Sequence, residues 1–281
     1  MEWERTKSIL LALFVLLNAA LGGLRFAEFR RHWMTEEQER NIRAVLSMHN
    51  IHLYAHPDRR FAPMRTIDVG GFYYDEDFLA GVFFGDGGAR RAEESGAVVF
   101  VSDSGYLEIS NGFVFFENLL LEGPGGEADR DFAQELTGEF IRRHFPGFEH
   151  DIMFPDAGGV RRIYREVHGG LMVYSNFIEF LVTEEGISQV EMQFGRVLGE
   201  SQMPPRTIIP PDEALLTFMQ RFSRDTVEDP IFIHRMDMVY VALYRSDEPG
   251  SLSPAAPFYR IFVEGNFFPL LINAFTNELA Y

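Results

Sequence analysis

The sequence contains no cysteine, which excludes disulfides, thiolate catalysis and cysteine-ligated metal sites. Lysine is nearly absent as well, since Lys7 is the only lysine among 25 basic residues. We attribute this bias to genomic coding preference, because no site chemistry would empty a whole chain of lysine. Positive charge is scarce, and 42 acidic residues give a net charge of −17. Because a chain this acidic repels phosphate backbones, we expect no nucleic-acid partner.

Recognisable catalytic motifs are also missing. The glycine-rich stretches at 85–88 and 123–126 lack the lysine and the strand-to-helix context of a phosphate-binding loop. The segment SDSG at 102–105 does not match a nucleophile elbow. Acidic runs such as 75–77 and 184–185 fall where turns are expected, so solvated turn faces explain them better than a paired-carboxylate hydrolase site.

The densest titratable cluster comprises His49, His52 and His56. These spacings would bring imidazoles together on a helix, but a strand is expected from Ile51 and Pro57 interrupts whatever follows. Histidines near the negative end of a helix are the simpler interpretation. We therefore predict no enzyme, no metal site and no cofactor.

What the chain does have is an apolar beginning. Ser8 to Leu24 is a stretch of 17 residues without charge, apolar on all sides, which disfavours a buried core helix. As a helix it measures about 25 Å, at the short edge of a membrane span. A cleaved signal peptide is the alternative, but Glu2 and Glu4 weaken the positive character of the tip. We expect a cytoplasmic tail at 1–7, a transmembrane helix at 8–25 and a juxtamembrane linker at 26–34.

The body reads as a mixture of helices and strands. Thr35 and Gln38 form a capping-box pattern before an amphipathic helix at 35–49, and further helices are expected at 130–146 and 211–225. Short β-like runs cover 70–88 and 96–123, and the Asp103-Ser104-Gly105 turn predicts a hairpin. Glycines at 122–129 mark a linker.

A weak internal repeat relates two segments, HGGLMVYSNFIEFLVTEEGIS and APFYRIFVEGNFFPLLINAFTNE. Each segment reads as a long strand followed by a second strand. The predicted fold class is therefore α+β, with an N-terminal transmembrane helix followed by two helix-plus-antiparallel-sheet units. The expected domains are 35–124 and 125–281.

The two ends of the chain resemble the YycI family, which is related to YycH. The opening EWERTKSILLALFVLLN has the family's acid–tryptophan pair, basic residues and polar-to-apolar transition, at Glu2, Trp3, Arg5, Lys7, Ser8, Ile9 and Asn18. The segment APFYRIFVEGN with LINAFTNE is similar to the family's closing pattern. The chain departs from that pattern in its lysine-free body and in Phe258, where tryptophan is often found.

The resemblance implies an accessory regulator of the sensor histidine kinase YycG (WalK), whose two-component system governs cell-wall metabolism. It implies a single-pass protein in the cell membrane, with a cytoplasmic N-terminus and an extracytoplasmic body, although the basic residues flanking the span do not favour this orientation. The expected partners are the kinase, a YycH-like protein and the membrane. Candidate partner-binding residues in the span are Trp3, Asn18, Ala19, Gly22 and Gly23, because small residues and an amide favour helix–helix contact.

Two other function classes stay open. An exported or anchored binding module for a cell-wall fragment, a peptide or a metal would show a ligand pocket. An anchored hydrolase would show carboxylates or histidines clustered in a cleft.

Overall fold

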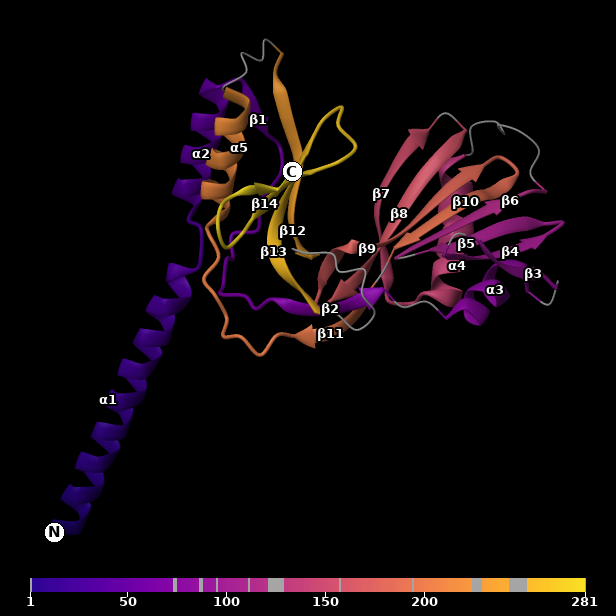
Figure 1. Cartoon of the computed structure of the whole chain (residues 1–281). Helices are drawn as coiled ribbons and strands as arrows, with labels where there is room; N and C mark the ends of the chain where they lie inside the picture. The colour runs from indigo at the N-terminus through magenta and orange to yellow at the C-terminus, as the bar shows by residue number, and fades with distance from the viewer. Residues whose placement is uncertain are drawn as a thin grey trace.

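The computed structural model of the chain describes residues 2–72, 75–85, 88–94, 96–110, 112–120, 129–156, 158–193, 195–223, 229–242 and 252–280. Within these residues there are five helices: α1 (Glu2–Arg31), α2 (Glu36–Met48), α3 (Glu76–Phe84), α4 (Arg130–His144) and α5 (Pro211–Ser223). The predicted linker at 122–129 lies outside the described residues except for Asp129, which caps α4. Figure 1 shows two lobes joined side by side, with α1 projecting from one of them.

The strands make up most of both lobes. They are β1 (Ile51–Leu53), β2 (Ile67–Phe72), β3 (Arg90–Glu94), β4 (Ala97–Ser102), β5 (Gly105–Ser110), β6 (Phe113–Asn118), β7 (Phe148–Asp156), β8 (Gly159–His168), β9 (Leu171–Thr183), β10 (Gly186–Gln193), β11 (Gly195–Glu200), β12 (Ile231–Ala242), β13 (Leu252–Val263), β14 (Leu270–Asn273) and β15 (Leu279–Ala280).

Local sequence signals account well for α2. Thr35 accepts a hydrogen bond from the Gln38 backbone, and the Gln38 side chain accepts one from the Thr35 backbone at 2.8 Å, which confirms the predicted capping box. The helices expected near 130–146 and 211–225 are confirmed as α4 and α5. The predicted hairpin is confirmed too, since Ser102 pairs with Gly105 at the β4–β5 turn.

Helix α3 was not anticipated, because its residues lie in a stretch that reads as β-like. Phenylalanine and valine favour strands, but the Asp75 carboxylate accepts a hydrogen bond from the Phe78 backbone at 3.0 Å and caps a helix instead. Leu79 then packs into the core, almost fully buried.

The predicted fold class is wrong in its arrangement of the sheet. The strands do not form two separate antiparallel units; they join in one large mixed sheet with the order β11-β2-β13-β12-β9-β10-β6-β5-β4-β3 along its main path. Most neighbours are antiparallel, but β12 runs parallel to both β1 and β9. The connections from β1 and β9 to β12 are long crossovers, which permit parallel pairing where a hairpin does not.

Two cores lie on either side of the strand that joins the lobes. The proximal lobe, next to α1, packs α2 and α5 against β1, β12, β13 and β14. The distal lobe packs α3 and α4 against β4, β5, β6, β8, β9 and β10. Strand β9 serves both lobes: its first residues pair with β12, and its later residues pair with β10.

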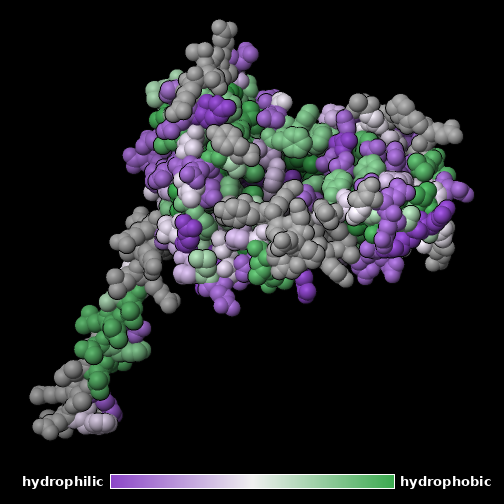
Figure 2. Space-filling view, viewed as in Figure 1, coloured by the Kyte–Doolittle hydropathy of each residue, from purple (hydrophilic) through white to green (hydrophobic). Residues whose placement is uncertain are grey.

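Helix α1 stands clear of the two lobes, and Figure 2 shows apolar side chains around its middle. No helix in the described part of the chain is long and apolar enough to cross a membrane. This finding overturns the predicted transmembrane helix at 8–25 and the single-pass localisation that depended on it. The uncharged stretch would measure about 25 Å, less than the about 30 Å of a hydrocarbon core, and it includes Asn18, Gly22 and Gly23.

Candidate functional site

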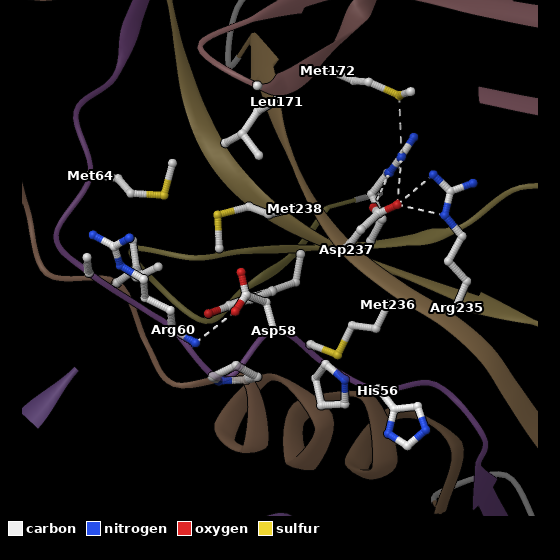
Figure 3. Close-up of a pocket in the computed structure, with 17 residues that line it drawn as sticks. His56, Asp58, Arg60, Met64, Leu171, Met172, Arg235, Met236, Asp237 and Met238 are labelled. Atoms are coloured by element: carbon white, nitrogen blue, oxygen red, sulfur yellow. Dashed lines mark hydrogen bonds and ion pairs between the residues drawn. The ribbon is translucent and has the colours of Figure 1, made fainter. Parts of the chain in front are cut away.

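A half-open pocket of about 530 Å³ lies in the proximal lobe beside β12. Its floor is formed by β12 and β13, and its sides by the segment after β1, the start of β9 and the approach to α5 (Figure 3). Its volume falls within the usual range for pockets that bind small ligands. The apolar lining consists chiefly of Met64, Leu171, Met172, Ile208, Met236 and Met238.

Methionine is the most distinctive component of this lining. Four of the chain's 11 methionines contribute to it, from the segment before β2, from β9 and from β12. Figure 3 shows Met64 and Met238 facing each other across one end of the pocket. Methionine is unbranched and polarisable, so such a wall adapts to ligands of different shapes.

The pocket exists because the sheet has a gap. Ile233 pairs with Leu53 of β1 on one edge of β12 and with Val263 of β13 on the other. Val239 similarly pairs with Met172 of β9 and with Phe258 of β13. Strands β1 and β9 therefore share one edge of β12, and the residues between them, 234–238, have no strand partner on that edge among the described residues.

Arg235, Asp237 and Arg260 line the polar side of the pocket. They belong to an arginine–aspartate cluster that also includes Asp151 and Arg165 behind the pocket wall. The Asp151 carboxylate lies 2.6 Å from Arg165, 2.7 Å from Arg260 and 3.3 Å from Arg235. The Asp237 carboxylate lies 2.6 Å from both Arg235 and Arg260. Because β7 and β8 supply two of these residues and β12 and β13 the others, the cluster ties the two lobes together.

Burial makes the charges of this cluster interdependent. The side chains of Asp151 and Arg260 are each only 1% exposed, whereas Arg235 is 37% exposed at the pocket. Burial alone would raise the pKa of Asp151, but the attraction of Arg260 and Arg165 and their hydrogen bonds outweighs it, so the pKa lies below its usual value. Three guanidiniums face two carboxylates, which leaves one excess positive charge at this end of the pocket.

Three further polar side chains line the pocket, those of Asp58, Arg60 and Tyr259. The Asp58 carboxylate accepts a hydrogen bond from the Arg60 backbone at 2.9 Å, and Figure 3 places the Arg60 guanidinium on the side of the pocket opposite Arg235. Burial raises the pKa of Tyr259, whose hydroxyl donates to the Ile209 carbonyl at 2.7 Å. The tyrosine therefore stays protonated and helps to fix the approach to α5.

The residues predicted as partner contacts lie elsewhere, on α1. Trp3 is 69% exposed, and Ala19, Gly22 and Gly23 are also exposed. The Asn18 amide donates to the Phe14 carbonyl within the helix at 2.8 Å. They share one helix but not the pocket, and their predicted role stays a prediction.

The three histidines that lie close together in the sequence are dispersed in the structure. His49 follows the last turn of α2, and His52 stacks on Phe232 with ring centroids 5.3 Å apart. Only His56 lines the pocket, with its Nδ1 at 3.4 Å from an Arg43 nitrogen. Within the described residues, no group of three histidines, aspartates or glutamates could hold a metal ion.

Sequence reasoning missed the arginine–aspartate cluster entirely. A signal for part of it exists, since Arg235, Asp237 and Arg260 lie within strand-like apolar runs. Charges at such positions are costly unless they are paired, so they indicate buried ion pairs. The pairing itself cannot be read locally, because Asp151 and Arg260 are 109 residues apart.

Comparisons with known proteins show the fold but no family. No protein-family model matches the sequence, and no curated protein matches it. The structure is similar to the crystal structure of an uncharacterized protein from Eubacterium rectale, with a TM-score of 0.55 and 11% identity, over 83% of this chain and 91% of that one. The YpeB C-terminal domain of Bacillus megaterium is a more distant neighbour, with a TM-score of 0.42 and 9% identity over 75% of this chain and 97% of that domain.

Proposed function

We propose that this chain is a non-enzymatic accessory protein that regulates a sensor histidine kinase of the YycG (WalK) type, together with a YycH-like partner. The resemblance of both chain ends to the YycI family supports the identity of the partners. In this proposal the protein acts by binding, and the kinase it regulates controls cell-wall metabolism.

The observation that carries the proposal is the exposed apolar surface of α1. Leu11, Phe14 and Leu16 are each more than 60% exposed on a helix that stands clear of both lobes. A contiguous apolar surface of this kind is typical of a site that a partner covers. Gly22 and Gly23 have no atoms within 4 Å of a would-be Cβ, so a partner helix can approach closely there.

The pocket chemistry agrees with a binding role. Its arginines and aspartates mostly bond to one another, and an arginine stays protonated throughout the accessible pH range. Such groups hold and orient a ligand rather than exchange protons with it.

A co-purification experiment tests the kinase proposal. The full chain carries a C-terminal tag, and residues 8–24 are replaced by an unrelated apolar helical sequence of equal length. The kinase should elute from a detergent extract with the native chain and be lost with the replaced one. A matched control changes the exposed, charged strand β3 (Arg90–Glu94) to alanines and should keep the kinase.

Retention of the kinase after the α1 replacement would contradict the role of α1 and move recognition to the lobes. If the native chain elutes without a kinase, the regulatory proposal fails.

The pocket favours a second candidate, a binding module for a peptide or a cell-wall fragment. This function needs a preformed cavity with an apolar lining and a few fixed polar groups, which are the features found beside β12.

A further inference from the structure

We propose that the gap beside β12 binds an extended peptide segment, which adds to the sheet as a strand between β1 and β9 and carries apolar side chains and a carboxylate. The inference names the ligand class of the binding-module candidate and rests on it; it is independent of the kinase proposal.

The backbone of β12 supplies the main argument. In a strand, alternate residues direct their N–H and C=O groups to each edge, and these groups need partners. Residues 234–238 have β13 on one edge only, while β1 ends at their beginning and β9 starts at their end. An extended peptide completes the ladder with main-chain hydrogen bonds, a known mode of peptide recognition.

The side-chain environment fits the same ligand. Side chains of an added strand alternate between the two faces of the sheet, so every second one points toward the pocket. There Met64, Met236 and Met238 offer apolar, adaptable contacts (Figure 3). The site would therefore accept different apolar residues and obtain its affinity mainly from the backbone.

The charges around the pocket favour a peptide that carries an acidic residue. The arginine–aspartate cluster holds one excess positive charge, and the Arg60 guanidinium has no carboxylate partner among the described residues. Arginine binds carboxylates through two parallel hydrogen bonds. A peptide with an acidic residue is thus complementary to Arg60, even though the whole chain carries a net charge of −17.

The test uses the full chain and a defined probe, the dye-labelled pentapeptide Leu-Val-Leu-Val-Glu, with fluorescence anisotropy as the readout. Three matched probes accompany it: one methylated on alternate backbone nitrogens, one ending in glutamine and one ending in lysine. We expect the first probe to bind saturably and the methylated probe to bind at least tenfold more weakly. Among residues 234–238, hydrogen exchange should slow for the amides that face the gap when the peptide is bound, and should not change for those that already bond to β13.

Two sets of variants assign the contacts. Met238→Asp places a charge in the apolar wall and should weaken binding at least tenfold, whereas the volume-conserving Met238→Leu should bind normally. Arg60→Ala, on the surface, should reduce the preference for glutamate over glutamine to near unity, and Arg90→Ala on the remote strand β3 should not change it.

The outcomes distinguish a failure of the peptide inference from a failure of the binding-module candidate on which it rests. Equal binding of the methylated and unmethylated probes would overturn strand addition, and a preference for the lysine probe would overturn the charge argument. If a cell-wall disaccharide of N-acetylglucosamine and N-acetylmuramic acid binds and is blocked by Met238→Asp while no peptide binds, the inference fails but the binding-module candidate stands. If neither the disaccharide nor any peptide binds, both fail.

Discussion

At the residue scale, Asp151 is the centre of the electrostatics. Its carboxylate is nearly inaccessible and contacts three guanidiniums. Removing it would leave buried positive charge without a counter-charge. Breaking a buried pair of this kind typically costs about 3–5 kcal/mol. Arginine side chains do not lose their proton in proteins, so the surrounding guanidiniums cannot compensate by becoming neutral.

The lowered pKa of Asp151 gives a prediction about acid stability. A carboxylate with a folded-state pKa below the unfolded value stabilises the fold above the unfolded pKa of about 4, and this contribution is lost as the pH falls through the folded-state pKa. Urea unfolding between pH 7 and pH 2 should therefore show a loss of stability below about pH 4, and this loss should be smaller in the Asp151→Asn chain.

The same variant should lose about 3–5 kcal/mol of unfolding free energy at pH 7. Asp103→Asn, at an exposed turn, is the control and should change stability by less than about 0.5 kcal/mol. An Asp151→Asn chain with native stability and an unchanged acid profile would contradict the assigned role.

At the element scale, the pairing of β11 with β2 depends on a glycine. A Cβ on Gly195 would lie 2.3 Å from the Gly70 carbonyl oxygen of the neighbouring strand. The Gly195 backbone also bonds on both sides to the Asn176 amide, at 2.8 and 3.1 Å. Close backbone approach and the buried amide thus fix where β11 begins.

Gly195→Ala should accordingly lower the unfolding free energy by about 1–3 kcal/mol, because the strands must separate to admit the methyl group. Gly147→Ala, where a Cβ meets no atom within 4 Å, is the control and should be near neutral. Urea unfolding measures both, and equal stabilities of the two variants would show that the β2–β11 contact is not limiting.

The elements themselves differ in how far the sequence predicts them. The Thr35–Gln38 capping box and the Ser102–Gly105 turn are local, and both predictions are confirmed. Helix α3 was missed because its cap at Asp75 competes with strand-favouring residues. The gap beside β12 could not be predicted, since it results from two parallel pairings between distant segments, Ile51 with Ile231 and Met172 with Val239.

At the scale of the whole molecule, the sheet runs through both lobes and across the predicted boundary between 124 and 125. Strand β2 lies between β11 and β13, and β6 pairs with β10. The domain boundary itself stays a prediction, and a fragment of residues 125–281 provides its test.

That fragment should not unfold cooperatively, because without β1, β2 and β6 the edges of β10, β11, β12 and β13 lose strand partners and exposed edges favour aggregation. The full chain should show one cooperative transition in urea, followed by circular dichroism, and should elute as a defined species. A fragment that is monomeric and unfolds cooperatively would instead support the boundary at 124.

The gap beside β12 also limits the length of the segment that can bind in it. Strand β1 blocks one end and β9 the other, so only residues 234–238 are open, a span of roughly 17 Å at about 3.3 Å per residue. A segment longer than about five residues cannot lie flat there; it must turn out of the sheet at both ends. The fold would thus discriminate by length as well as by composition, and would exclude the long, regular strands through which the edge of one sheet pairs with the edge of another.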